Sequence, residues 1–176
     1  KKEDVTSRVC MLHHDYDWKG YKDAIEAVKK VRSENCKVEL VVFGEKLEDP
    51  TPLYEEAGFQ FEYHFRPTGE ALRKIYSSCG TFLCSSWYEG LGMPAMEAMM
   101  CGTALVTTDT GGSRDYALNE VTALVSPIKN PEALAENLIR VLTDESLRLQ
   151  LAEKGYKKIQ QFSWDSNCEQ LVKYFK

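Results

Sequence analysis

The sequence predicts an α/β fold: a Rossmann-like domain with about six parallel strands flanked by helices. Short apolar runs, often β-branched, alternate with longer amphipathic runs, which is the pattern of repeated βα units on a parallel sheet. The chain has 176 residues, of which 43% are hydrophobic and 28% charged, and it shows no internal repeat or low-complexity stretch. We therefore expect residues 1–176 to form one domain.

Strands are expected where the apolar runs are short and rich in β-branched or aromatic residues. The predicted strands are Arg8–His13, Lys37–Phe43, Phe59–Phe65, Thr81–Cys84, Ala104–Thr107 and Ala123–Val125. The loosely punctuated stretch Gly44–Thr51 is expected to be a long loop after the second strand.

Helices are expected between the strands. The clearest is Tyr21–Arg32, in which Ala24, Ile25, Ala27, Val28 and Val31 form one apolar stripe. Asn130 and Asp144 or Glu145 are suitable residues for opening the helices that follow them. The other predicted helices are Glu70–Ser77, Pro94–Met100, Pro131–Leu142, Ser146–Phe162 and Trp164–Phe175.

Composition excludes several classes of function. A net charge of -5 and a pI near 5.3 argue against a nucleic-acid partner, because the chain carries no basic stripe. Apolar runs such as Val38–Phe43 are far shorter than the roughly 20 residues that span a bilayer, so no transmembrane segment is expected. The six cysteines form no CxxC pair. We interpret them as buried free thiols of a reducing cytosol rather than as disulfides or zinc ligands.

The segment Ser85–Glu97 is the strongest candidate for chemistry, because it follows a strand and opens a helix. In open parallel sheets, ligands bind beyond the carboxyl ends of the strands. Gly90 and Gly92 allow backbone N–H groups to approach a ligand closely, and Pro94 fits a first helical turn. The unpaired N–H groups and the dipole of a helix start then favour an anion such as phosphate.

Two glutamates flank these glycines. Glu97 is a lone polar residue in an apolar helix, where it is either stabilised by the helix start or a bidentate acceptor for vicinal sugar hydroxyls, such as those of a ribose. Glu89 is either a carboxylate that faces the ligand cleft or an ordinary exposed loop residue.

A second candidate is the loop His13–Gly20 after the first strand. Lys19, at the start of a helix, either offsets the negative charge of a diphosphate or is a solvated residue. His13 and His14 are each as readily structural as ligand-binding. A third candidate is Asp109–Asp115, with its Gly-Gly pair, which is otherwise a plain turn. No group of residues has metal-ligand spacing, so we expect no metal and no cofactor.

Two alternatives belong to other classes of function. Gly90–Ala95 also fits the dinucleotide pattern G-x-G-x-x-A, with Asp109 about twenty residues further on, as in an NAD-dependent oxidoreductase. That pattern normally follows the first strand tightly, whereas here five residues separate the strand from the glycines. The other alternative is a non-catalytic carbohydrate-binding or partner-binding module.

The segment 89–102, in the form E-G-x-G-x-P-x-x-E-A-M-x-C-G, resembles the Glu-x7-Glu signature of retaining glycosyltransferases of family 4 (Glycosyl transferases group 1). Thr103–Gly112, Thr122–Pro127 and Asn130–Ala135 resemble later segments of that family. The resemblance covers most of the chain from about Arg8 onward.

The resemblance implies the C-terminal, nucleotide-sugar-binding half of a GT-B fold, with the N-terminal acceptor domain absent from this chain. A start at Lys1 without methionine likewise leads us to expect an excised fragment. By resemblance, Glu89 contacts the transferred sugar and Glu97 the ribose. The backbone of Gly90, Leu91, Gly92 and Met93 would meet sugar hydroxyls and diphosphate.

Other residues match the pattern of the family only in part. Lys19 matches the Lys of a Lys-Gly pair in the family. Relatives usually have an arginine at the end of the first strand, where this sequence has His13 and His14. Arg66 follows the third strand, in the region that holds the nucleotide base in relatives, but an arginine after a strand is more often simply a surface residue.

The implied function is transfer of a hexose from a nucleotide diphosphate sugar to a hydroxyl acceptor with retention, in surface polysaccharide or glycolipid synthesis, with Glu89 as the catalytic residue. The implied partners are the nucleotide sugar donor and the missing acceptor domain. The implied location is the cytoplasm, at the inner face of the membrane if the missing half contacts it.

Overall fold

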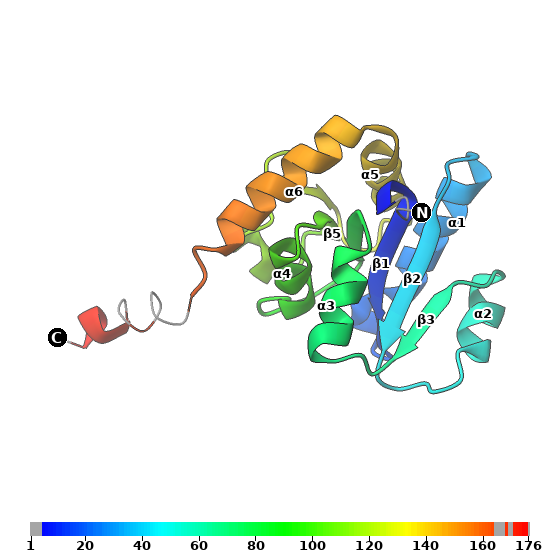
Figure 1. Cartoon of the computed structure of the whole chain (residues 1–176), viewed down its shortest axis with the longest axis horizontal. Helices are drawn as coiled ribbons and strands as arrows, with labels where there is room; N and C mark the ends of the chain where they lie inside the picture. Colours follow the sequence, from blue (N-terminus) through cyan, green and yellow to red (C-terminus); the bar gives the residue numbers. More distant parts are fainter. Residues whose placement is uncertain (1–4, 164–167, 169–170, 176) are drawn as a thin grey trace.

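Six parallel strands form the centre of the molecule (Figure 1). The computed structural model describes residues 5–163, 168 and 171–175. The strands are β1 (Arg8–His13), β2 (Glu39–Gly44), β3 (Glu62–Phe65), β4 (Thr81–Cys84), β5 (Ala104–Thr108) and β6 (Ala123–Ser126). Their order across the sheet is β3-β2-β1-β4-β5-β6. The chain therefore winds outward from β1 in one direction and from β4 in the other, and the predicted sheet is confirmed.

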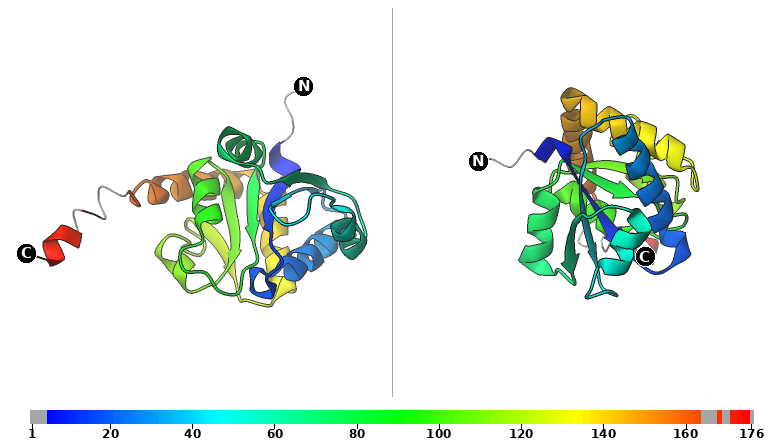
Figure 2. Two further views of the ribbon diagram at one scale, coloured as in Figure 1. Left: turned by 90° about the horizontal axis from the view of Figure 1, so that it is seen from below. Right: turned by 90° about the vertical axis from the view of Figure 1, so that its right-hand side faces the viewer.

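Helices cover both faces of this sheet. They are α1 (Tyr21–Ser33), α2 (Thr51–Ala57), α3 (Gly69–Ser77), α4 (Met93–Met100), α5 (Pro131–Thr143) and α6 (Glu145–Ile159). Within the described residues, short 3-10 helices lie at η1 (Val5–Ser7), η2 (Asp17–Lys19) and η3 (Gly112–Asp115). In the right-hand view of Figure 2, α1 and α5 lie on one side of the sheet and α3 on the other.

Two apolar cores follow from this layering. On the α1 and α5 side, alternate residues of β1 such as Val9 and Met11 pack against Ile25 and Leu138. On the other side, the intervening Cys10 packs in a cluster to which the strands and the helices α3 and α4 all contribute. Because successive strand residues point to opposite faces, a strand covered on both sides must be apolar along its whole length. That requirement explains the continuous apolar runs in the sequence.

The predicted helix openings at Asn130 and Asp144 are confirmed. The Asn130 side chain accepts a hydrogen bond from the N–H of Ala133 at 3.0 Å, and the Asp144 side chain accepts one from Leu147 at 2.9 Å. Each satisfies a backbone donor that the first helical turn leaves unpaired.

Several predicted elements differ from the structure in their bounds. The region after β2 ends in the short helix α2, which the sequence analysis did not assign, since only Leu53 and Ala57 of it are buried. The third strand begins at Glu62 rather than Phe59, because Phe59 and Phe61 pack against the core without pairing to β2. Half of the predicted helix at 164–175 lies outside the described residues, and in the other half residues 168 and 171–174 are helical.

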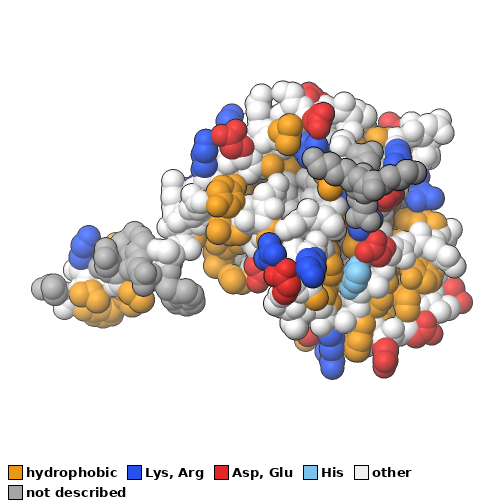
Figure 3. All heavy atoms as spheres, viewed as in Figure 1, with side chains coloured by type: hydrophobic (Ala, Val, Ile, Leu, Met, Phe, Trp, Pro, Cys, Tyr) orange, Lys and Arg blue, Asp and Glu red, His pale blue; other side chains and the backbone are white. Residues whose placement is uncertain are grey.

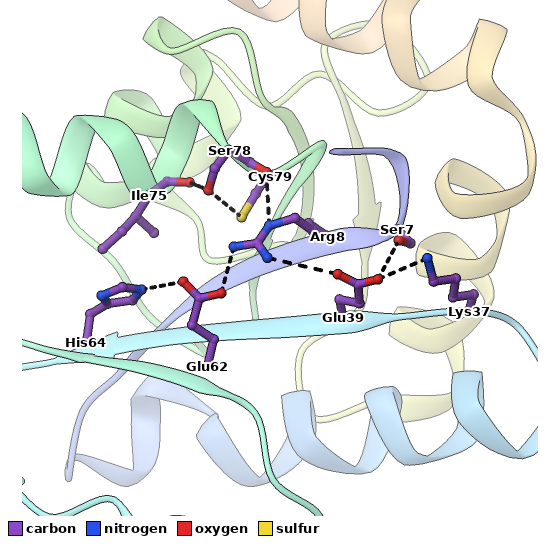
Figure 4. Close-up of polar contacts among 9 residues, drawn as sticks. All are labelled: Ser7, Arg8, Lys37, Glu39, Glu62, His64, Ile75, Ser78 and Cys79. Atoms are coloured by element: carbon purple, nitrogen blue, oxygen red, sulfur yellow. Dashed lines mark hydrogen bonds and ion pairs between the residues drawn. The ribbon is translucent and has the colours of Figure 1, made fainter. Parts of the chain in front are cut away.

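A polar cluster closes the amino ends of β1, β2 and β3 (Figure 4). Arg8 donates to Glu62 at 2.8 Å and to the carbonyl of Ser78 at 3.2 Å, and it lies 3.9 Å from Glu39. Burial raises the pKa of Glu62, but the hydrogen bonds from Arg8 and His64 outweigh it and hold the pKa below its ordinary value. This cluster lies at the opposite ends of the strands from the loops that the sequence analysis singled out.

All six cysteines are free thiols, as expected, but they are not all buried. Cys10 and Cys79 are buried, whereas Cys168 is exposed because it lies in the tail beyond the two cores. Over the residues that the structure describes, no helix combines the length and the apolar character needed to cross a bilayer.

Candidate functional site

Lys19 and Glu89 meet at the point where the sheet reverses its winding. Lys19 ends η2 after β1, and Glu89 follows β4, the neighbour of β1 in the sheet. The Lys19 Nζ donates to Glu89 Oε1 at 2.8 Å, and Ser86 Oγ donates to the same oxygen at 2.8 Å. The two side chains of the pair are 20% and 15% exposed, so their contact is partly shielded from water. Ligands of open parallel sheets bind at such a reversal.

Gly20 fixes the position of Lys19. It adopts a left-handed conformation with φ 64° and stands at once at the end of η2 and at the start of α1. A Cβ at this position would come closer than 3.0 Å to the carbonyl of Ser85. Ser85 Oγ also donates to the Lys19 carbonyl at 3.2 Å, and the N–H of Trp87 donates to Trp18 at 2.7 Å. The loop after β1 is thereby tied to the segment after β4.

The Gly-Gly loop after β5 supports Glu89 from the other side. Gly111 forms an isolated parallel bridge with Glu89. A Cβ on Gly112 would clash with the carbonyl oxygens of Glu89 and Gly90, so only glycine allows this approach. The glycines of the candidate segment Asp109–Asp115 are thus in backbone contact with the segment that carries Glu89.

The start of α4 forms one wall beside this ion pair. Gly92 precedes the helix with φ 73°, and no side chain caps it. Within the described residues, the backbone N–H groups of Leu91, Gly92 and Met93 donate no hydrogen bond. Gly92 and Pro94 line a small pocket together with Lys19, Ser86 and Glu89. Unpaired donors, the positive end of a helix dipole and a lysine in one pocket are the elements of an anion site.

Glu97 lies in a different pocket. It is on α4, where it lines a groove of about 420 Å³ with Leu72, Tyr76 and Met96, and its Oε2 accepts a hydrogen bond from the Tyr76 hydroxyl at 3.1 Å. Burial raises the pKa of Tyr76, and the nearby Glu97 carboxylate raises it further. Hydrophobic side chains gather over α4 and the end of α6 around this groove (Figure 3). Glu89 and Glu97 therefore line separate pockets that are both bordered by α4.

His13, His14 and Arg66 are not brought to the Lys19–Glu89 pair. His13 is buried at the end of β1, and burial lowers its pKa. His14 stacks on Tyr16 with ring centres 4.2 Å apart. Arg66 has φ 47° and donates to the carbonyl of Glu45 at 3.0 Å, beyond the end of β3.

Ser86 and Trp87 lie in the candidate segment Ser85–Glu97, but the sequence indicates no role for either side chain. Ser86 orients the Glu89 carboxylate, and a hydroxyl three residues before that carboxylate was the available signal. The Trp87 ring donates to Asp23 at 2.7 Å and lies 4.1 Å beneath the ammonium of Lys129. No spacing in the sequence connects these three residues, because they come from separate βα units.

Asp109, the acidic residue of the dinucleotide alternative, is already paired. Arg114 donates to both of its carboxylate oxygens at 2.8 Å, and these hydrogen bonds hold the pKa of Asp109 below its ordinary value. The glycines of this alternative follow β4, whereas the fingerprint belongs after the first strand of its fold. No group of three or more potential metal ligands is found in the described part of the chain, and the expectation of no metal stays a prediction.

Comparisons with known proteins agree with this architecture. Residues 2–158 match the family described as Glycosyl transferases group 1. The uncharacterized glycosyltransferase MJ1607 of Methanocaldococcus jannaschii is 28% identical over 162 residues, which cover 90% of this chain and 42% of the relative. The D-inositol 3-phosphate glycosyltransferase of Salinispora tropica is 33% identical over 134 residues, covering 73% and 28% respectively. The chain thus spans less than half the length of these curated relatives.

Solved structures share the fold. HepE of Anabaena, in complex with UDP and glucose, superposes with a TM-score of 0.80 at 18% identity, covering 97% of this chain and 48% of that one. A mutant of S. aureus TarM, in a complex that includes UDP, gives a TM-score of 0.82 at 17% identity, covering 97% and 35%. The C-terminal domain of the glycosyl transferase LpcC from Francisella tularensis gives 0.70 at 22% identity, covering 88% and 84%.

The reversal of the sheet between β1 and β4, the lysine and glutamate that meet there, and the family match over residues 2–158 lead to one conclusion. The chain belongs to the Glycosyl transferases group 1 family.

Proposed function

We propose that this chain is the nucleotide-sugar-binding half of a retaining glycosyltransferase of family 4, with a GT-B fold. The enzyme transfers a hexose from a nucleotide diphosphate sugar to a hydroxyl acceptor. The observation that carries the proposal is the contact of Lys19 Nζ with Glu89 Oε1 at 2.8 Å, beside the uncapped start of α4. In support, solved relatives of the same fold are described in complex with UDP and glucose or with UDP.

Lys19 changes partner in this proposal. Without donor, Lys19 and Glu89 neutralise each other. A diphosphate carries more negative charge than one carboxylate and can also accept from the free N–H groups at the start of α4. The donor therefore draws Lys19 to its phosphates and releases Glu89 toward the sugar. In the transition state, Lys19 and the helix start stabilise the departing nucleoside diphosphate, and Glu89 positions the sugar and stabilises its developing positive charge.

The separate pockets of Glu89 and Glu97 fit an extended donor. The pyrophosphate lies over the start of α4, the sugar lies toward Glu89, and the ribose lies toward Glu97, which accepts from its hydroxyls in place of the Tyr76 hydroxyl. Arg66 remains the candidate for the base, at the end of β3. The proposal gives His13 no role at the phosphates, because His13 lines neither pocket.

The remainder of the enzyme is proposed by resemblance. An N-terminal acceptor domain supplies the opposite wall of the cleft, and the product is a surface polysaccharide or a glycolipid made in the cytoplasm, at the inner face of the membrane. Neither a metal nor a cofactor takes part. We expect the 176-residue chain by itself to bind a nucleoside diphosphate but to transfer no sugar, because the acceptor wall is missing.

Calorimetric titration with UDP, GDP and ADP tests the donor site. Lys19→Ala should weaken binding of the preferred nucleotide at least about tenfold, since it removes a charge-assisted contact. Glu89→Gln should strengthen binding, because it frees Lys19 from its internal partner. Lys157→Ala is the matched control, since Lys157 pairs with Glu153 on α6, away from the site. Equal affinities in wild type and Lys19→Ala would contradict the phosphate role.

The roles of the two glutamates separate in different assays. Glu97→Ala should weaken nucleotide binding, whereas Glu89→Ala should mainly lower turnover of the full-length enzyme. NMR of the product of the full-length enzyme gives its anomeric configuration. Inversion of the anomeric configuration would contradict the retaining mechanism. Tighter binding of NAD than of any nucleoside diphosphate would favour the oxidoreductase alternative.

A further inference from the structure

A second pocket lies beyond the carboxyl end of β1. This loop pocket, of about 210 Å³, is lined by His13, Asp15, Tyr16, Tyr21, Glu56 and Trp87 among others. It shares no lining residue with the pocket that holds Lys19 and Glu89. The two are neighbours, since the N–H of Trp87 donates to the carbonyl of Trp18, the residue before Lys19.

Two buried polar atoms belong to residues that line the loop pocket and have no partner. His13 is 5% exposed and Tyr21 is 6% exposed, and neither His13 Nδ1 nor the Tyr21 hydroxyl makes a hydrogen bond within the described residues. Their rings meet edge to face, with centres 4.7 Å apart. Buried polar atoms are nearly always paired, so two unpaired atoms beside one pocket indicate groups that a ligand satisfies.

A stack of three rings stands at the same loop. Tyr16 lies between His14 and Trp18, with ring centres 4.2 and 4.3 Å away and planes 24° and 14° apart. Tyr16 is 49% exposed and Trp18 is 44% exposed. Trp18 ends the stack, since no further ring among the described residues packs on it. Rings held in this way offer a flat apolar surface at a low entropic cost of ordering.

The charge around the pocket selects against anions. Asp15, Asp17 and Glu56 line it, with Lys22 as the one ammonium among the lining residues. A carboxylate can only accept hydrogen bonds, so a matching ligand must donate them. A phosphate group would be repelled. A neutral ring with hydroxyl groups around its edge and C–H bonds on its face satisfies both the carboxylates and the aromatic surface.

We propose that the loop pocket and its ring stack bind a neutral pyranose of the acceptor glycan. The sugar lies in the loop pocket, where its hydroxyls donate to the carboxylates and meet His13 and Tyr21. Trp18 does not line the pocket itself; it stacks on Tyr16, which does, and the sugar face extends onto it. The identification of this sugar as part of the acceptor rests on the proposed function. The site itself rests on the unpaired buried atoms and the ring stack.

Saturation-transfer NMR and calorimetry on the 176-residue chain test the site with methyl pyranosides of glucose, mannose, galactose and N-acetylglucosamine. We expect at least one of them to bind, Trp18→Ala to weaken that binding at least about tenfold, and Trp18→Phe to restore most of it. Tyr156→Ala is the matched control, because Tyr156 is a half-exposed aromatic residue on α6. A thermal melt of each variant confirms that it folds, and Tyr21→Phe should weaken binding severalfold without changing that melt.

UDP, GDP and ADP are titrated into the same samples to keep the two claims apart. Nucleotide binding without binding of any pyranoside overturns the saccharide site and leaves the proposed function intact. Pyranoside binding that Trp18→Ala leaves unchanged also overturns the site. Pyranoside binding that depends on Trp18, in a chain that binds no nucleotide, supports the site and contradicts the proposed function.

Discussion

Gly20→Ala should destabilise the domain and displace Lys19. Two costs add. A residue with a Cβ in the left-handed conformation costs about 1–2 kcal/mol, and Gly20 has φ 64°. Crowding against the Ser85 carbonyl, which the new Cβ would approach closer than 3.0 Å, costs about 1–3 kcal/mol more. Alanine also restricts the unfolded chain more than glycine does, which stabilises the folded state by about 0.4–1 kcal/mol and offsets part of these costs. The expected net loss is about 2–4 kcal/mol, equivalent to a Tm lower by about 5–15 °C for a chain of this size.

Gly58→Ala is the matched control, because it isolates the steric part. Gly58 has φ 73°, but a Cβ there meets nothing within 4 Å, so only the conformational cost remains, about 1 kcal/mol after the same offset. Urea unfolding followed by circular dichroism gives both values. Equal destabilisation of the two variants would refute the claim that Gly20 is needed for contact between the loops after β1 and β4. Nucleotide affinity should fall in Gly20→Ala and stay unchanged in Gly58→Ala.

Three further predictions follow from individual contacts. Gly90→Ala should leave the free energy of unfolding within about 0.5 kcal/mol of the wild-type value, since a Cβ there meets open space. It should nevertheless weaken nucleoside diphosphate binding. An unchanged affinity in calorimetry would show that the backbone at this position meets no ligand. Tyr76→Phe removes a hydrogen bond to Glu97 and should cost about 1 kcal/mol in urea unfolding, so a stability equal to wild type would show that this bond contributes nothing. The pKa of Glu62 is held below its ordinary value of 4.5, so its stabilising contribution is complete above about pH 4.5 and is lost as pH falls through the lower native value. Unfolding measured from pH 6 to pH 3 should therefore show a smaller acid loss for Glu62→Gln than for wild type, and parallel curves would contradict that shift.

The two glutamates show which features of the site the spacing in the sequence predicts and which it does not. Their spacing, with glycines between them, predicted that the start of α4 faces a ligand, and the uncapped Gly92 agrees with that prediction. The spacing gave no indication that Glu89 pairs with Lys19 or that Glu97 pairs with Tyr76 in another pocket. Sequence spacing fixes the neighbours of a residue along one element, whereas these partners come from other βα units.

The glycines illustrate the same limit. Gly20 and Gly112 were interpreted as parts of loops that approach a ligand, but in the structure each makes room for another backbone segment. A Cβ on Gly90 would meet nothing within 4 Å, so the requirement for glycine at that position does not arise from the fold of this chain. Only the packed structure separates these two uses of glycine.

The sequence by itself determined the layers of this domain. Apolar runs that must be covered on both faces, amphipathic helices such as Tyr21–Ser33 and the capping residues Asn130 and Asp144 are local patterns, and local patterns persist whatever the rest of the chain does. The tertiary structure alone decided which loops meet. The order of the strands places β1 beside β4, and this adjacency brings Lys19 to Glu89 across 70 residues of chain, a distance over which no periodicity or propensity acts.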